Sequence, residues 1–396
     1  MKARKKTIFI TQEDMMKKTG IVALLVLASL SLAACGGNDN SGTDSTGSAA
    51  SSESSQATSD SAAPANITIA EGKAPEGTEV PGAGTVIMRQ MYAAPHGTKS
   101  FAAVNVTMNG DTIVTARLDE FQYVEPGDFK GVPNADAGFG ESFPDGNILV
   151  GKEENDDAYS AMMKDHGGAT QTWKDSMEAI TNFVKGKTVA DVEAAIKELE
   201  GQGDDAKPAD VVTGSTFSDT RGYLQAIVDT AKSGMISVGE KSDTTDLKEA
   251  QTLSAPHGDK SFAVTTVAMD GDKVAAVFVD EFQFVEAADF GGVPNSDSDF
   301  GQGVKNGQVL ASKEANNEAY SAMMKDHAGA TQTYSDNMKA VEDFVIGKTI
   351  ADIEKAISEL EAQGDDAKPA DVVTGATFAD TKGYLQAIVD TAKNVN

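Results

Sequence analysis

Two short segments of the sequence combine a glycine, a hydroxyl and a following helical pattern, which together could present a hydroxyl beside a helix terminus that favours anions. The first runs Asp210-Val211-Val212-Thr213-Gly214-Ser215-Thr216, and the second runs Asp371-Val372-Val373-Thr374-Gly375-Ala376-Thr377. The glycine removes the Cβ that would obstruct a modifying enzyme. A helix after the first segment, with Ser218 or Asp219 as its N-cap, would direct N–H groups and a positive dipole end toward a phosphate. The simpler interpretation is a turn that leads into a helix.

The chain contains one sequence unit twice. The offset is 161 residues throughout: Ala94-Pro95-His96-Gly97 recurs as Ala255-Pro256-His257-Gly258, and Val132-Pro133-Asn134 recurs as Val293-Pro294-Asn295. The two threonine–glycine segments follow the same offset. This period is too long for a solenoid repeat and suits an independently folding domain. We expect a first domain at 86–232, an inter-domain linker at 233–246 and a second domain at 247–396.

Within each copy, the apolar pattern predicts strands first and helices later. In the first copy, residues 100–108 and 112–123 alternate apolar with polar residues around Asn109-Gly110, which favours a β-hairpin. The Gly-, Asp- and Pro-rich stretch at 126–146 is typical of a loop. Helical patterns follow at 157–166, 170–185, 189–200 and 224–231, the third opened by a capping box of Thr188 and Asp191. This order favours an α+β domain with helices packed on an antiparallel sheet.

The threonine–glycine segments resemble the acceptor motif of the FMN-binding domain family, which reads Asp, two residues, Ser or Thr, Gly, Ala, Thr. In that family a flavin transferase joins FMN through its phosphate to the last threonine. The resemblance therefore implies covalent FMN on Thr216 and Thr377, with Ser215 departing from the usual alanine. It implies that the motif positions are Asp210, Thr213, Gly214, Asp371, Thr374 and Gly375. Similarity at Thr172-Trp173 with 183–188, and at Thr333-Tyr334 with 344–349, extends the resemblance to about 140 residues per copy.

The N-terminal part of the chain is typical of an exported protein. Lys17 and Lys18 precede an apolar run at 21–32, which is shorter than the roughly 20 residues that a membrane-spanning helix needs. Leu32-Ala33-Ala34-Cys35 resembles the bacterial lipobox, so we expect a signal peptide at 1–34 and a lipid on Cys35, the single cysteine. The Gly- and Ser-rich composition that follows predicts a disordered linker, which we place at 35–85.

The lipobox, the linker and the two flavin domains together resemble the flavinylated lipoproteins of Gram-positive extracellular electron transfer. That resemblance implies a non-enzymatic electron carrier, anchored by its lipid to the outer face of the cell membrane. Its electrons would come from a membrane quinol-linked donor and pass to extracellular acceptors such as ferric iron. The net charge of −28 excludes nucleic acid as a partner, because phosphate binding needs clustered Lys and Arg.

Other residues are weaker candidates for a functional site. Trp173 and Tyr334 are candidates for stacking on the isoalloxazine ring, although an aromatic on a helix is more often part of the core. The four histidines occur singly within their motifs, which argues against metal ligation. The sequence lacks HExxH, GxSxG and P-loop signatures, which argues against a self-contained hydrolase or NTPase.

Two alternatives stay open at this point. The chain could be a non-redox surface lipoprotein, a binding or adhesive module in which the threonine segments are simple turns. The released signal fragment could also act as a peptide signal, which would be compatible with either function.

Overall fold

The computed structural model describes residues 66–203, 207–364 and 368–395. The predicted signal peptide, the predicted lipidation site Cys35 and residues 36–65 of the predicted linker lie outside the described residues. The described residues form the predicted α+β fold, with two antiparallel sheets of five and four strands. Within these ranges, none of the helices combines the length and apolar character that crossing a bilayer requires.

The first sheet has the strand order β4-β3-β2-β1-β5 and contains the predicted hairpin. Strands β2 and β3 pair antiparallel up to Asn109 opposite Thr112, which leaves Gly110 and Asp111 in the turn. Gly110 has a φ of +63°, a conformation that glycine adopts without steric cost. The strands of this sheet are β1 (Val86–Ala93), β2 (Ser100–Asn109), β3 (Thr112–Val124), β4 (Ile148–Gly151) and β5 (Met235–Val238).

The helices of the first repeat lie where the sequence predicts them, with shifts of a few residues at their ends. The predicted capping box is confirmed: the Thr188 side chain accepts a hydrogen bond from the Asp191 N–H, and the Asp191 carboxylate accepts one from the Thr188 N–H. The structure also contains a short helix at 208–211 and a 3-10 turn at 138–142, where the sequence predicts no helix. The helical elements are η1 (Gly138–Ser142), α2 (Asp156–Gly167), α3 (Trp173–Val184), α4 (Val189–Gln202), α5 (Pro208–Val211) and α6 (Thr220–Ser233).

The second repeat follows the same plan. Its sheet has the order β6-β7-β8-β9. The strands are β6 (Lys248–Ser254), β7 (Ser261–Asp270), β8 (Lys273–Glu286) and β9 (Gln308–Ser312). The helices are α7 (Asn317–Ala328), α8 (Tyr334–Val345), α9 (Ile350–Gln363) and α10 (Thr381–Lys393), with 3-10 turns η3 (Asp299–Gly301), η4 (Lys305–Gly307) and η6 (Pro369–Asp371).

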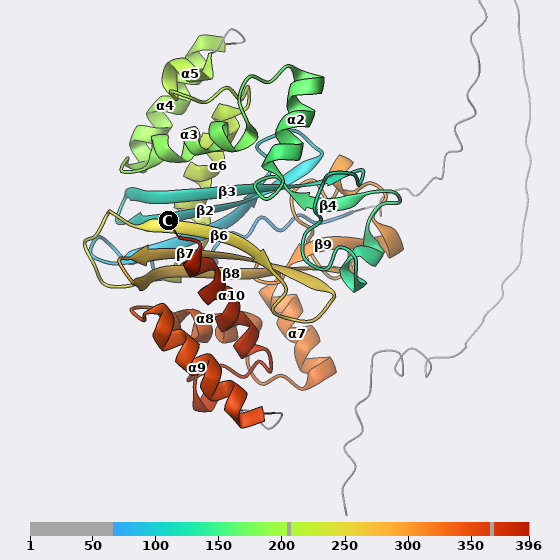
Figure 1. The fold of residues 1–396 in the computed structure, drawn as a ribbon, viewed down its shortest axis with the longest axis vertical. Helices are drawn as coiled ribbons and strands as arrows, with labels where there is room; N and C mark the ends of the chain where they lie inside the picture. Colours follow the sequence, from blue (N-terminus) through green and yellow to red (C-terminus); the bar gives the residue numbers. More distant parts are fainter. Residues whose placement is uncertain (1–65, 204–206, 365–367, 396) are drawn as a thin grey trace, which may run out of the picture. The chain divides into compact units, whose positions relative to one another are not determined.

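The two sheets pack face to face, and each carries its own helices on its outer face (Figure 1). Aromatic rings fill the space between the sheets: Phe101 lies 5.7 Å from Phe282, and Phe121 lies 5.5 Å from Phe262, between ring centroids. A second core in each repeat lies between the sheet and its helices. All ten residues of β2 are buried as a result. The repeats therefore share the core between their two sheets. The layers follow in the order helices, sheet, sheet, helices.

Parts of both predicted linkers belong to this fold. Ala70 N donates to Gly292 O and Ala74 N donates to Ser233 O, both at 2.8 Å, so residues 66–85 are not a free tether. Strand β5 lies inside the predicted linker at 233–246 and pairs antiparallel with β1. These contacts are made by backbone N–H and C=O groups, which nearly every residue has. The side-chain composition therefore gives no sign of them, and the sequence alone predicts linkers here.

Candidate functional site

Each candidate acceptor threonine lies on an exposed loop just before the last helix of its repeat. The side chains of Thr216 and Thr377 are exposed, and α6 and α10 begin four residues after them. The two loops have closely similar conformations, because Gly214 and Gly375 have φ angles of +93° and +94°. Both threonines therefore lie at the surface of the described part of the chain.

The glycine of each loop is required for two reasons. Its positive φ is one that residues with a side chain rarely adopt. A Cβ on either glycine would also lie 3.2 Å from the Cβ of an alanine in the neighbouring helix, Ala179 in α3 and Ala340 in α8. The backbone of the loop consequently lies close against that helix.

Among the other residues of each motif, the second valine is buried, and the aspartate and the first threonine are exposed. Val212 and Val373 are fully buried and anchor the loops, and their carbonyl oxygens accept hydrogen bonds of 3.0 Å from the N–H groups of Ser215 and Ala376. The polar motif residues are exposed: Asp210, Thr213, Asp371 and Thr374. The motif therefore places its polar side chains where a modifying enzyme could recognise them.

Ser215, which departs from the family pattern, does not crowd the acceptor. Its side chain is fully buried, and its hydroxyl lies 2.7 Å from the hydroxyl of Thr220 at the start of α6. Ala376 is fully buried at the matching position. The serine hydroxyl is thus satisfied inside the repeat and leaves Thr216 exposed.

A polar residue from the preceding helix supports each acceptor hydroxyl. In the second repeat, Asn337 of α8 is buried, and its Oδ1 accepts hydrogen bonds from the Thr377 N–H at 2.6 Å and the Thr377 hydroxyl at 2.9 Å. In the first repeat, the buried Ser176 hydroxyl lies 3.1 Å from the Thr216 hydroxyl. Sequence reasoning missed both supporting residues.

A histidine from the loop between the first two strands of each repeat borders the same helix terminus. His96 Nδ1 lies 2.8 Å from Asp219 Oδ2, and His257 Nδ1 lies 2.7 Å from Asp380 Oδ2. Asp219 is at the N-cap position, as predicted, but its carboxylate is directed to His96 and does not cap α6. This hydrogen bond from His96 holds the pKa of Asp219 below its ordinary value.

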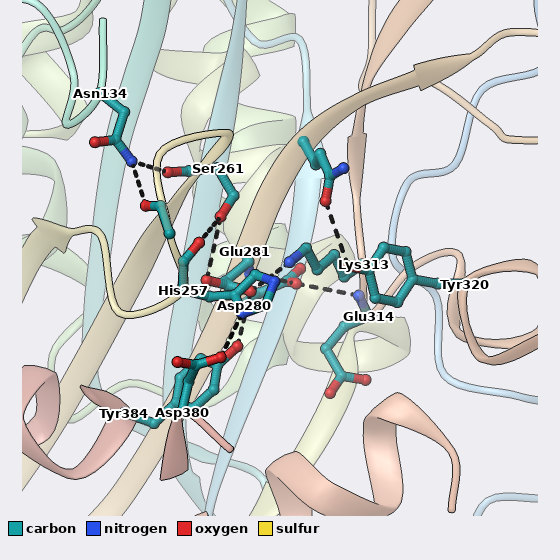
Figure 2. Close-up of polar contacts among 12 residues, drawn as sticks. Asn134, His257, Ser261, Asp280, Glu281, Lys313, Glu314, Tyr320, Asp380 and Tyr384 are labelled. Carbon is teal, nitrogen blue, oxygen red and sulfur yellow. Dashed lines mark hydrogen bonds and ion pairs between the residues drawn. The ribbon is translucent and has the colours of Figure 1, made fainter. Parts of the chain in front are cut away.

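A buried ion pair lies next to each histidine–aspartate pair. In the second repeat, Lys313 Nζ lies 2.6 Å from Glu281 Oε2, and the Tyr384 hydroxyl of α10 donates to the same oxygen at 2.8 Å (Figure 2). Burial alone would lower the pKa of Lys313, but the attraction of the Glu281 carboxylate outweighs it and raises that pKa above its ordinary value. The first repeat has the same cluster, formed by Lys152, Glu120 and Tyr223.

The two aromatic side chains that were candidates for stacking on a flavin ring are both buried, as the core interpretation predicts. Trp173 is 2% exposed and Tyr334 is 1% exposed, and each belongs to the core between the sheet and the helices of its repeat. Among the described residues, Trp173 Nε1 and the Tyr334 hydroxyl have no hydrogen-bond partner. The half-buried aromatics next to the acceptors are instead Phe217 and Phe378, whose rings contact Tyr223 and Tyr384.

The described ranges contain no group of three or more His, Cys, Asp or Glu side chains arranged to hold a metal ion. Four surface cavities, of about 10 to 650 Å³, were located over the same ranges, and neither acceptor threonine lines any of these four.

No protein-family model matches this chain, and no curated protein or solved structure is significantly similar to it.

Proposed function

We propose that this protein is a lipid-anchored extracellular electron carrier that holds two FMN groups, joined through their phosphates to Thr216 and Thr377. The observation that carries this proposal is the matched geometry of the two acceptor loops. Each has an exposed threonine, a glycine of positive φ two residues before it and the start of a long helix four residues after it. Electrons would come from a membrane quinol-linked pathway and pass to extracellular acceptors such as ferric iron.

The residues of the loops fit a phosphodiester. The N-terminal ends of α6 and α10 favour negative charge, because their first N–H groups and the helix dipole are directed toward the loop. Asp219 would repel a phosphate at this position, but its carboxylate is directed to His96 Nδ1 and does not cap the helix. Thr216 and Thr377 would hold the cofactor, and Ser176 and Asn337 would orient their hydroxyls.

FMN supplies reversible redox chemistry when it is bound, and the protein supplies attachment and surroundings. No residue of the chain is required to act as an acid or a base in such a carrier. A flavin lost outside the cell would not be recovered, so an ester bond to the chain serves retention. The predicted lipid on Cys35 and the linker after it would keep the two-repeat unit at the membrane.

The first test is direct detection of the cofactor on the chain. Full-length protein is produced in cells with an active flavin transferase, denatured, and examined for fluorescence of the protein band and for intact mass. We expect two added FMN moieties, one of which is lost with Thr216→Ala and the other with Thr377→Ala.

The control is Ser218→Ala, two residues after the first acceptor, because Ser218 is exposed and alanine already stands at the matching position 379. This variant should keep both moieties. A wild-type chain that remains colourless and unmodified, with a transferase that modifies another acceptor, would contradict the proposal and would leave a non-redox surface lipoprotein.

A further inference from the structure

Each repeat contributes one asparagine whose side chain donates hydrogen bonds to the backbone of the other repeat. Asn134 of the first repeat donates from Nδ2 to Gly258 O and to Ser261 O, both at 2.8 Å, in the second repeat (Figure 2). Asn295 of the second repeat donates to Gly97 O at 2.9 Å and to Ser100 O at 2.7 Å in the first. Because both repeats make the same contact, we attribute it to the repeated sequence and not to a single chance contact.

Both asparagines have a backbone conformation that few other residues adopt. The φ angles are +65° for Asn134 and +68° for Asn295. Asparagine is among the residues that tolerate this left-handed region, and glycine is the other common choice. The positions therefore combine a left-handed backbone with a side-chain amide that donates to two carbonyl oxygens.

Each amide holds the loop that carries the histidine of the opposite repeat. Asn134 contacts both sides of the turn after His257, and a backbone bond of 2.8 Å from Phe139 N to Asp259 O reinforces the contact. The Ser261 hydroxyl donates back to His257 O at 3.0 Å. In the mirrored contact, Phe300 N donates to Thr98 O at 2.9 Å.

The histidine loop in turn lies against the helix that follows the acceptor. His257 pairs with Asp380 at the N-cap of α10, three residues after Thr377. A Cβ at Gly383 would lie 2.5 Å from Pro256 O, so the loop and the first turn of α10 are in close contact. The same holds in the first repeat, where a Cβ at Gly222 would lie 2.7 Å from Pro95 O.

We infer that Asn134 and Asn295 are positioning residues exchanged between the repeats, each of which holds the histidine loop beside the acceptor threonine of the other repeat. Each attachment site is then completed by both copies. Loss of Asn134 should disturb the site of the second repeat, and loss of Asn295 should disturb the site of the first. The part of this inference that concerns modification rests on the proposed function.

The first experiment measures modification at each site. The reaction joins the threonine Oγ to phosphorus and breaks a pyrophosphate P–O bond of a flavin dinucleotide, with a nucleoside monophosphate leaving and the hydroxyl proton passing to a base of the transferase. Unmodified full-length chain is incubated with transferase and flavin dinucleotide, and peptides containing Thr216 and Thr377 are followed by mass. Asn134→Gly keeps the backbone conformation and removes the amide, and it should slow modification of Thr377 about fivefold while Thr216 is unchanged.

Asn295→Gly should give the reverse pattern, and Asn134→Asp, which replaces the donor with an acceptor, should reproduce Asn134→Gly. The matched control is Asn147→Gly, since Asn147 donates locally to Asp145 O at 3.3 Å within the first repeat. A variant that slows both threonines equally, or slows the threonine of its own repeat, overturns the inference.

The second experiment does not depend on the flavin. Side-chain NMR resonances of the histidines are compared at one pH in unmodified wild type, Asn134→Gly and Asn295→Gly. We expect Asn134→Gly to shift the imidazole signals of His257 and to leave those of His96 in place, with the opposite result for Asn295→Gly. Equal shifts at both histidines, or none, overturn the inference, whereas an absence of modification in wild type alone counts against the proposed function.

Discussion

At the scale of single residues, the two acceptor hydroxyls differ in the side chain that orients them. The Asn337 amide donates from Nδ2 to Thr333 O, and its Oδ1 accepts both the N–H and the hydroxyl of Thr377. This arrangement fixes the hydroxyl hydrogen inward and leaves the oxygen lone pairs outward. Ser176 offers Thr216 a freely rotating hydroxyl at 3.1 Å. We expect Thr377 to be modified about fivefold more slowly than Thr216, because its hydroxyl hydrogen must leave the Asn337 amide, at the cost of roughly one net hydrogen bond, before the base of the transferase can take it.

Exchange of the two supporting residues is a test of this expectation with an internal control. Asn337→Ser should accelerate modification of Thr377, and Ser176→Asn should slow that of Thr216, in a time course read by peptide mass. Equal rates at both sites in wild type and in both variants would show that Ser176 and Asn337 do not affect the reactivity of the two threonine hydroxyls.

The loops that carry the candidate acceptors could be predicted from the sequence, but the residues around them could not. Threonine after glycine before a helix is a local pattern, so it is visible in one stretch of sequence. Ser176 and Asn337 show a weaker signal, since each is a polar residue on the apolar face of an amphipathic helix. Their contact with a loop 40 residues later depends on tertiary packing, which a local pattern does not encode.

At the scale of elements, a buried cluster joins the last helix of each repeat to the sheet beneath it. Lys313, Glu281 and Tyr384 connect the region just after β9 with β8 and α10. Lys313→Met would leave the Glu281 carboxylate in the core without its counter-charge. We expect a loss of about 3–5 kcal/mol in the free energy of unfolding, measured by urea denaturation of the full chain.

The matched control is Lys339→Met, which removes an exposed ion pair with Asp343 one helical turn away. Its expected cost is below about 0.5 kcal/mol. If the two variants were equally stable, the buried pair would contribute no more than a surface pair, and the coupling of α10 to the sheet would have to come from apolar contacts.

The elements themselves were mostly predictable because their signals are local. The hairpin turn, the capping box of α4 and the amphipathic helices follow from periodicity and from short-range hydrogen bonds. Strand β1, strand β5 and the residues before β1 were missed as paired elements. The partners of β5 and of the residues before β1 are distant in sequence, and the composition of these two segments resembles that of connecting segments. Strand β1 pairs with β2, the next strand along the chain, so its pairing was a local signal that the sequence prediction did not use.

At the scale of the whole molecule, the face-to-face packing of the repeats was hidden by polar residues in the strands. Asn105 and Thr107 of β2 alternate with apolar residues, which suggests a face exposed to water. Both are fully buried, because Thr107 donates to Glu249 of the second repeat and Asn105 donates to Gln90 of the adjacent strand. A strand buried on both faces can therefore have the alternating sequence of an amphipathic strand when its polar side chains find hydrogen-bond partners inside the protein.

Three buried carboxyl groups at this contact predict how stability depends on pH. Burial raises the pKa of Asp280 to about 6, that of Glu249 to about 7 and that of Glu342 to about 8. Each has a hydrogen-bond partner in the first sheet or its edge strand: Tyr92, Thr107 and Ser237, respectively. The folded state holds these protons at a pH where the unfolded chain has lost them. The stability from these protons is therefore fully present below about pH 4. It falls as pH rises from there to the folded-state pKa of each group, by about 1.4 kcal/mol per pH unit for each group until that pKa is passed.

Thermal unfolding of the full chain between pH 5 and pH 9 measures this dependence. Glu249→Gln and Glu342→Gln remove a titrating group while keeping a polar side chain, so each should raise the melting temperature at pH 8 and flatten its fall with pH. The general repulsion within a chain of net charge −28 acts in the same direction, and Glu286→Gln corrects for it by removing one exposed negative charge. If Glu286→Gln flattened the profile as much as the buried variants, total charge would govern the pH response. If the buried variants alone flatten it, protonation at the contact between the repeats stabilises the pair of sheets.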